Sequence, residues 1–245
     1  MEDKALLSTE VASGAEKAEI LIVIPAYNEA ENIERVVNHL TANFPQYDYV
    51  VVNDGSRDET AAICQRNGYN LLNLPVNLGL AGAFQAGLKY ADKYGYQYAV
   101  QLDGDGQHRP EYLESMIKKM EEGYDIVIGS RFVGEKKPFT MRMLGSNLIE
   151  MAIRFTTGVN IKDPTSGMRM FSKRMIREFA SGLNYGPEPD TVSYLIRQGA
   201  RVAEVPVIMD ERILGVSYLT PVNAMRYMLK MLISILLIQN FRKRR

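Results

Sequence analysis

The chain has 245 residues, of which 46% are hydrophobic, and its 29 basic residues balance its 29 acidic residues. This length and composition allow one or two domains with a buried core, and the neutral balance gives no reason to expect nucleic acid as a partner. The single cysteine, Cys64, excludes an intrachain disulfide and suits a reducing, cytosolic compartment. Because Cys64 lies in an apolar helical run, we expect it to serve packing.

Residues 1–17 are predicted to form a flexible N-terminal tail, because they lack the basic start and apolar core of a signal peptide. No apolar run along the chain reaches the roughly 20 residues that a membrane-spanning helix needs.

From Glu19 onward, short apolar runs alternate with longer amphipathic stretches. The apolar runs predict strands at 20–24, 49–52, 71–72, 98–102 and 125–128, and the stretches between them predict helices near 29–43, 58–67, 80–94 and 110–122. This alternation is typical of an α/β fold with a mainly parallel, Rossmann-like sheet flanked by helices. Ligands of such sheets bind beyond the carboxyl ends of the strands.

Polar clusters follow four of the predicted strands, and the one after 98–102 is the most informative. The clusters are Tyr27-Asn-Glu29, Asn53-Asp54-Gly-Ser56, Asn77-Leu-Gly79 and Asp103-Gly-Asp105. Two carboxylates one residue apart at the end of an extended strand share a face. Hard cations such as Mg²⁺ or Mn²⁺ bind one or two carboxylates together with substrate phosphates, so this pair indicates diphosphate chemistry.

Three other interpretations compete with a metal site for diphosphate. Asp-Gly-Asp-Gly also occurs in solvated turns. An EF-hand would place its ligands at Asp103, Asp105, Gln107 and Glu114, but it requires glycine where this chain has His108 and a helix where it has a strand. A dinucleotide-binding domain requires G-x-G-x-x-G after the first strand, and the turn here, residues 25–29, contains no glycine.

Taken together, seven ordered motifs resemble the family 2 glycosyltransferases with a GT-A fold, specifically the dolichyl- or polyprenyl-phosphate sugar synthases. The motifs are Val23-Ile-Pro-Ala-Tyr-Asn-Glu29, Val52-Asn-Asp-Gly-Ser-Arg-Asp58, Asn77-Leu-Gly-Leu80, Leu102-Asp-Gly-Asp-Gly-Gln107, Gly129-Ser-Arg131, Asp163-Pro-Thr-Ser-Gly-Met-Arg169 and Arg212-Ile-Leu-Gly-Val-Ser217. The resemblance implies a GT-A domain over residues 18–220.

The resemblance also implies a donor site for a nucleoside diphosphate sugar, with UDP-sugar preferred over GDP-mannose. It assigns the nucleotide and its sugar to Pro25, Tyr27, Glu29, Asp54, Gly79 and Asp103. Asp54 would accept the imide N–H of the base, and Tyr27 would stack on it. The metal ion would bind Asp103, Asp105 and Gln107, while His108 is treated as a bystander.

The chemistry of the acceptor favours a phosphate over a hydroxyl group. A hydroxyl acceptor needs a general base, whereas a phosphate monoester carries about −1.5 to −2 charges at pH 7 and needs cations to hold it. The acceptor-phosphate candidates are Arg131, Arg169, Arg212 and Ser217, and the catalytic candidates are Asp163, Arg131 and Arg212. Asp163 is the preferred carboxylate for orienting or activating the acceptor, ahead of Glu188 and Asp190.

Residues 221–245 are predicted to form an amphipathic helix with a basic end, and residues 141–155 a second amphipathic stretch. Both suit a membrane interface, while packing in the core or in an oligomer is the alternative. With the resemblance, the prediction is an inverting, metal-dependent glycosyltransferase that moves a sugar from a nucleoside diphosphate to a polyprenyl phosphate. It would work on the cytoplasmic face of the membrane, as a homo-oligomer or with a small membrane protein. The alternatives are transfer to a glycan hydroxyl and a non-catalytic nucleotide-sugar-binding subunit.

Overall fold

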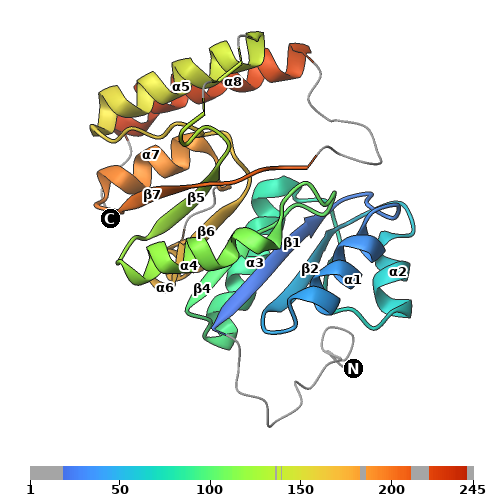
Figure 1. The fold of residues 1–245 in the computed structure, drawn as a ribbon. Helices are drawn as coiled ribbons and strands as arrows, with labels where there is room; N and C mark the ends of the chain where they lie inside the picture. The colour runs from blue at the N-terminus through green and yellow to red at the C-terminus, as the bar shows by residue number, and fades with distance from the viewer. Residues whose placement is uncertain (1–18, 136, 139, 183–185, 211–220, 242–245) are drawn as a thin grey trace.

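The computed structural model describes residues 19–135, 137–138, 140–182, 186–210 and 221–241, so the predicted tail at 1–17 lies outside the described residues. Seven strands form one sheet in the order β3-β2-β1-β4-β6-β5-β7 (Figure 1). The strands are β1 (Ile20–Ala26), β2 (Asp48–Asp54), β3 (Leu71–Leu74), β4 (Tyr98–Gln101), β5 (Ile126–Ser130), β6 (Arg169–Ser172) and β7 (Val202–Pro206). The expected mainly parallel sheet is confirmed, and β6 is antiparallel to both neighbours, β4 and β5.

The helices between the first five strands agree with the sequence prediction. They are α1 (Ile33–Asn43), α2 (Thr60–Arg66), α3 (Gly79–Tyr94) and α4 (Leu113–Glu121), the last preceded by the 3₁₀ turn η1 (Pro110–Tyr112). Helix α1 begins four residues later than the predicted start at 29, because Asn28 adopts a left-handed conformation (φ +56°) and residues 29–32 form a turn.

Helices cover both faces of the sheet and form two apolar cores. Because side chains alternate along a strand, Ile20, Ile22 and Ile24 of β1 pack with α1, α2 and α4, while Leu21 and Val23 pack on the other face. Helix α3 lies against that second face at Gly87, where an added Cβ would be 2.3 Å from Cγ1 of Val23. The missing side chain of Gly87 therefore permits α3 to pack closely on the sheet.

Cys64 belongs to the core beneath α2 and is fully buried. Burial raises the pKa of its thiol to about 11, so the thiolate is scarce at neutral pH. The predicted packing role is confirmed.

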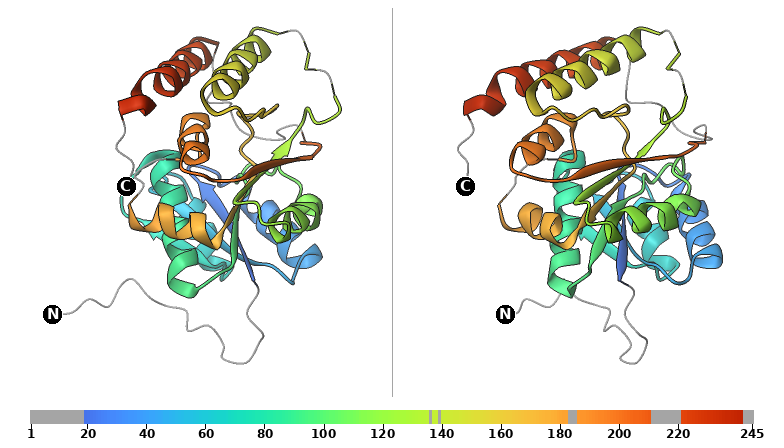
Figure 2. Two further views of the ribbon diagram at one scale, coloured as in Figure 1. Left: turned by 90° about the vertical axis from the view of Figure 1, so that its left-hand side faces the viewer. Right: turned by 60° about the vertical axis from the view of Figure 1, so that its left-hand side comes forward.

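The second half of the chain adds α5 (Met141–Thr157), α6 (Lys173–Ser181), α7 (Pro189–Arg197), α8 (Pro221–Leu236) and the 3₁₀ turn η2 (Ile238–Phe241). Helices α5 and α8 run side by side as an outer layer beyond α7 (Figures 1 and 2). Among the described residues, no helix has both the length and the apolar character to cross a bilayer.

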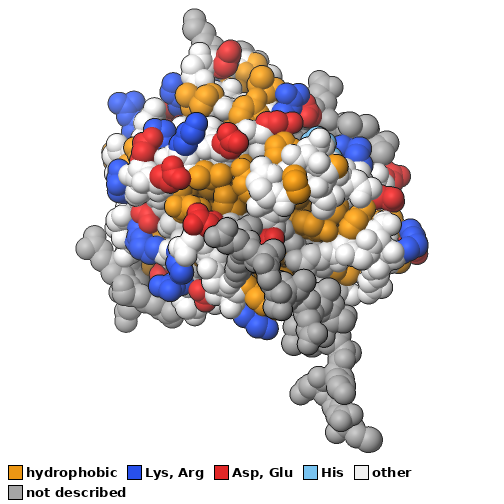
Figure 3. Space-filling view, turned by 60° about the horizontal axis from the view of Figure 1, so that its bottom comes forward, with side chains coloured by type: hydrophobic (Ala, Val, Ile, Leu, Met, Phe, Trp, Pro, Cys, Tyr) orange, Lys and Arg blue, Asp and Glu red, His pale blue; other side chains and the backbone are white. Residues whose placement is uncertain are grey.

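The surface carries charges of both signs, as the balanced composition leads one to expect. On the face drawn in Figure 3, basic and acidic side chains are interspersed. This face therefore carries no extended field of one sign.

Candidate active site

The turns after β1 and β2 are joined to each other by hydrogen bonds. Asn28 donates its backbone N–H to the Ser56 hydroxyl (3.0 Å) and accepts the Arg57 backbone N–H on Oδ1 (2.9 Å). Pro25 is the next-to-last residue of β1, and Tyr27, directly after the strand, is 43% exposed. An aromatic ring thus faces solvent at the edge of the sheet where ligands of α/β proteins bind.

Asp54, at the end of β2, joins its own loop to the loop that precedes α3. The residue is 3% exposed, and its Oδ1 accepts the Leu78 backbone N–H at 2.7 Å. Gly55 (φ +62°) permits this approach, since a Cβ there would be 2.7 Å from the carbonyl carbon of Val76. Gly79 opens α3 directly after Leu78, so the predicted donor residues Asp54 and Gly79 lie together.

Asp103 and Asp105 lie in a turn beyond β4 rather than on the strand, which corrects the predicted geometry. Strand β4 ends at Gln101, and the turn is closed by a hydrogen bond from the Gly106 N–H to the Asp103 carbonyl (3.3 Å), with Gly106 at φ +80°. Arg35 of α1 donates from Nη2 to the Asp105 carbonyl at 2.9 Å. The positions of the two carboxylates are therefore set by this turn and by its hydrogen bond to helix α1.

His108 is a structural part of this turn, and the expectation that it is a bystander is wrong. It is 7% exposed, and its Nδ1 accepts the Asp103 backbone N–H at 3.0 Å. Gly167, from the motif at 163–169, lies against both side chains: a Cβ there would be 3.1 Å from Oδ2 of Asp103 and from Cε1 of His108. The structure thus brings the predicted acceptor motif directly against the predicted metal turn.

The turn offers oxygen atoms that fit a hard divalent cation. Asp103 accepts a hydrogen bond from the Gln101 amide on Oδ1 (3.0 Å), and Asp105 accepts the Gln107 backbone N–H on Oδ1 (3.0 Å). Within the described ranges, no group of three or more His, Cys, Asp or Glu residues is placed to hold a metal. Two carboxylates match the way Mg²⁺ binds, with water and substrate phosphates as further ligands.

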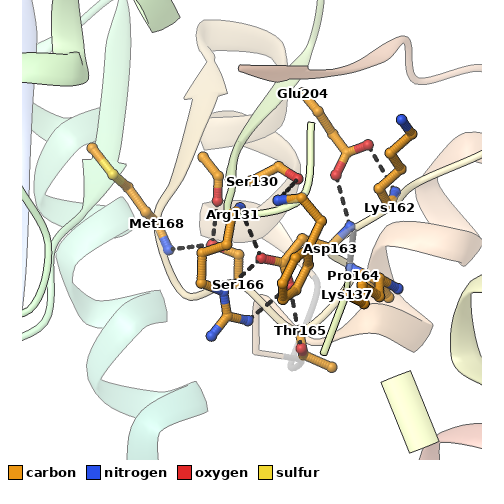
Figure 4. Close-up of polar contacts among 12 residues, drawn as sticks. Ser130, Arg131, Lys137, Lys162, Asp163, Pro164, Thr165, Ser166, Met168 and Glu204 are labelled. Carbon is orange, nitrogen blue, oxygen red and sulfur yellow. Dashed lines mark hydrogen bonds and ion pairs between the residues drawn. The ribbon is translucent and has the colours of Figure 1, made fainter. Parts of the chain in front are cut away.

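Arg131 and Asp163 form a bidentate ion pair at the end of β5 (Figure 4). Nε and Nη2 of Arg131 donate to the two carboxylate oxygens at 2.7 and 2.8 Å, and the Arg131 backbone N–H adds a third bond at 3.1 Å. Glu204 of β7 accepts the backbone N–H groups of Lys162 and Asp163 at 2.8 Å each. The hydrogen-bonded carboxylate raises the pKa of Arg131 despite burial.

This pairing corrects the role predicted for Asp163. Its side chain is fully buried, whereas that of Arg131 is 25% exposed. Both Asp163 oxygens bond to Arg131 rather than facing a substrate, so Asp163 orients the arginine that reaches the surface of the site.

Arg169 does not present its guanidinium to a phosphate, which corrects the predicted acceptor role. The residue is 2% exposed, and burial lowers its pKa. Its guanidinium donates to the carbonyl oxygens of Ser166 (2.8 Å), Pro164 (2.6 Å) and Pro187. Arg169 therefore holds the acceptor motif in its folded shape.

Glu188 and Asp190, the lesser carboxylate candidates, bind helix α8 instead of facing the metal turn. The Tyr227 hydroxyl donates to Oε2 of Glu188, and the Ser234 hydroxyl donates to Oδ2 of Asp190 at 2.6 Å. Burial, together with the nearby Glu188 charge, raises the pKa of Tyr227. These two bonds fasten the inner side of α8 to the start of α7.

Arg212 and Ser217 lie outside the described residues, but the chain that leads to them is fixed at the metal turn. Arg109 donates from Nε to both carboxylate oxygens of Asp210 at 2.9 Å, and these hydrogen bonds lower the pKa of Asp210. The Gln107 amide donates to the Asp210 carbonyl at 3.1 Å, so the coordination predicted for Gln107 would have to use Oε1. Asp210, the last described residue before this gap, therefore lies beside the metal turn.

Sequence reasoning missed three residues that shape the site, namely His108, Arg109 and Glu204. His108 and Arg109 come shortly after the Asp-x-Asp motif, separated from it by Gly106 and Gln107, and this proximity was the available signal. Glu204 lies in β7, a strand that the sequence did not predict, and its partners are 41 and 42 residues away. No local pattern could have revealed that contact.

The arrangement of sheet, helices and strand-end loops is that of the GT-A glycosyltransferases. The solved structure of glucosyl-3-phosphoglycerate synthase from Mycobacterium tuberculosis, in complex with Mn²⁺, UDP and glucosyl-3-phosphoglycerate, is similar to this fold with a TM-score of 0.65 and 19% identity. The match covers 90% of this chain and 79% of that chain.

The family model "Glycosyl transferase family 2" matches residues 21–179, and the chain belongs to that family of glycosyltransferase enzymes. It is 32% identical over 223 residues to a polyprenol monophosphomannose synthase of Mycolicibacterium smegmatis, covering 86% of this chain and 84% of the relative. It is 31% identical over 210 residues to an undecaprenyl-phosphate mannosyltransferase of Micrococcus luteus, covering 81% and 86%. The predicted family and branch resemblance are confirmed.

If Arg169 is structural, Arg169→Met should lower the free energy of unfolding by at least about 2 kcal/mol, because each buried carbonyl left without a donor costs about 1–3 kcal/mol. Urea titration measures this change. Arg174→Met, which removes an exposed arginine paired with Asp125, is the matched control and should cost less than about 1 kcal/mol. Unchanged stability of Arg169→Met with weaker acceptor binding would restore the phosphate-binding role.

Proposed function

We propose that this enzyme transfers a sugar, with inversion, from a nucleoside diphosphate sugar to a polyprenyl phosphate on the cytoplasmic face of a membrane. The observation that carries the proposal is the meeting of two predicted sites. Gly167 of the acceptor motif lies against Asp103 of the metal turn, and Asp163 of the same motif holds Arg131. A bound diphosphate at the turn would thus have an oriented guanidinium nearby.

The donor half of the proposal uses the loops after β1, β2, β3 and β4. Tyr27 and Asp54 would bind the base, Pro25, Glu29 and Gly79 would line the nucleotide, and Asp103, Asp105 and Gln107 would hold Mg²⁺ or Mn²⁺. When bound, the ion would offset negative charge on the departing nucleoside diphosphate. UDP-sugar is the preferred donor, and the names of the relatives, which include mannosyl and N-acetylglucosaminyl transfer, make GDP-mannose the second donor to test.

The choice of a phosphate as the acceptor rests on the ion pair between Asp163 and Arg131. A hydroxyl acceptor would require a carboxylate to remove its proton, and the carboxylate predicted for that task has both oxygens bonded to Arg131. A phosphate monoester is already ionised at pH 7. It requires only a cation that points at it, and Arg131, one quarter exposed and held in one orientation, supplies that cation.

Purified enzyme with Mn²⁺, farnesyl phosphate and either UDP-sugar or GDP-mannose should therefore form a lipid-linked product that releases its sugar in mild acid, as a phosphodiester does. Chromatography of radiolabelled product measures this outcome. Product formed only on saccharide hydroxyls would replace the proposed acceptor. Binding of nucleotide sugar with no turnover on either acceptor class would instead favour the non-catalytic subunit.

Removing one metal-turn carboxylate should abolish turnover without unfolding the protein. We expect Asp105→Ala to lower kcat by about two orders of magnitude or more, because charge stabilisation by a bound cation is worth several kcal/mol. Asp92→Ala, which removes an exposed carboxylate of α3, is the control and should be fully active. Normal turnover of Asp105→Ala would end the metal assignment.

The membrane contact is proposed for the outer face of α5 and α8. This face carries Leu144, Leu148, Met151 and Phe155 of α5 and Met225, Leu229 and Ile233 of α8, all 43–85% exposed. Exposed apolar groups this dense mark interaction surfaces, and the exposed Arg154, Arg226 and Lys230 nearby suit anionic headgroups. A homo-oligomer or a small membrane protein would be the alternative partner of the same face.

Wild-type enzyme should sediment with vesicles of phosphatidylglycerol and phosphatidylcholine. Met151→Glu combined with Phe155→Glu should bind them about tenfold or more weakly, because two apolar anchors are lost and anionic headgroups repel the new carboxylates. Gln65→Glu combined with Gln97→Glu adds the same charge at exposed positions elsewhere and should bind normally. Failure of the wild type to bind vesicles, with a dimer that the first pair of substitutions dissociates, would assign the face to a second copy.

A further inference from the structure

A second cation, Lys137, contacts the same aromatic ring as Arg131, that of Phe132. Nζ of Lys137 is 5.6 Å from the centroid of the ring, and Cζ of Arg131 is 5.3 Å from the same centroid. The two positive charges can be no further apart than the sum of these distances. Arg131 and Lys137 therefore place two positive charges in one small region, and both kinds of side chain can donate charge-assisted hydrogen bonds to a phosphate.

Each of the two cations is paired with a carboxylate, but the two pairs are built differently. Asp163 is fully buried and accepts three hydrogen bonds from Arg131, two from the side chain and one from the backbone. Glu150 of α5 accepts one bond from Nζ of Lys137, at 2.7 Å, and its side chain is 23% exposed, against 12% for that of Lys137. Of the two carboxylates, Glu150 has fewer bonds and easier access to water.

The two cations and their two carboxylate partners have a net charge of zero. A phosphate dianion that binds to Arg131 therefore meets two carboxylates as well as two cations. Asp163 cannot leave Arg131 without losing three hydrogen bonds from it, and the Thr165 hydroxyl donates a fourth at 3.4 Å. Glu150, which is partly exposed, can turn toward solvent. A phosphate oxygen would then take the place of the Glu150 oxygen at Nζ of Lys137. The exchange conserves the number of charge-assisted hydrogen bonds made by Lys137 and places both cations on the phosphate.

We propose that Lys137 is a second acceptor-phosphate ligand, occupied by Glu150 in the absence of acceptor and released to the phosphate when acceptor binds. The inference rests on the proposed function and deepens it. It makes the site selective for a phosphate monoester, with two negative charges, over an acceptor with one charge or none. It also connects this selectivity to α5, the helix whose outer face carries Met151 and Phe155.

The test compares two substitutions that should act in opposite directions. With the donor that supports turnover, Lys137→Met should raise the KM for farnesyl phosphate about ten- to a hundredfold, because a charge-assisted hydrogen bond is lost. Glu150→Gln should lower that KM, because the competing carboxylate is gone. In both variants the KM for the nucleotide sugar and the kcat at saturating acceptor should stay within about threefold of wild type.

Lys162→Met is the matched control, because it removes an exposed lysine next to Asp163 while leaving the backbone N–H that bonds Glu204, and it should leave every constant unchanged. If the ion pair were purely structural, Lys137→Met and Glu150→Gln would change the KM for farnesyl phosphate in the same direction, and that result would overturn the inference. An unchanged KM in Lys137→Met would also overturn it. Turnover of farnesyl phosphate by the wild type decides the proposed function separately, so the two failures are distinguishable.

Discussion

The buried ion pair between Asp163 and Arg131 is the constraint on which the rest of the site depends. Burying a carboxylate away from water destabilises the folded state. A partner cation offsets this loss of stability only when the geometry and the hydrogen bonding are nearly complete. Asp163 meets this condition through three bonds from Arg131, while Glu204 holds the backbone on its other side. Breaking the pair would leave a buried charge, so the orientation of Arg131 is fixed by the stability of the fold.

The antiparallel strand β6 explains how the acceptor motif reaches the donor side. Strand β6 lies between β4 and β5, and the motif at 163–168 precedes it, so the motif is delivered to the same edge at which β4 ends. Arg169, the first residue of β6, donates to two carbonyl groups within this motif and to the carbonyl of Pro187. Gly167 then fits against Asp103 and His108 because it has no side chain.

Helix α8 meets the protein through buried apolar side chains, Met231 and Ile235, and through two polar contacts beside them. Tyr227 and Ser234 bind the two carboxylates at the start of α7, and Met225, Leu229 and Ile233 are exposed on the other side. Glu188 and Tyr227 also lie close enough to Arg169 to influence its pKa. The proposed membrane surface and the acceptor motif are therefore connected through one short series of buried polar contacts.

The sequence by itself determined the alternating strands and helices up to β5, the polar loops at their carboxyl ends and the family, because these follow from local hydrophobic periodicity and from motifs of adjacent residues. Only the tertiary structure decided which charged groups face the site. Asp163 and Arg169 are charged residues of a polar motif, yet both are buried. Lys137 and Glu150 form an ion pair although 13 positions separate them in the sequence. Burial and pairing depend on chain segments that pack from a distance, and no local pattern of residues encodes them.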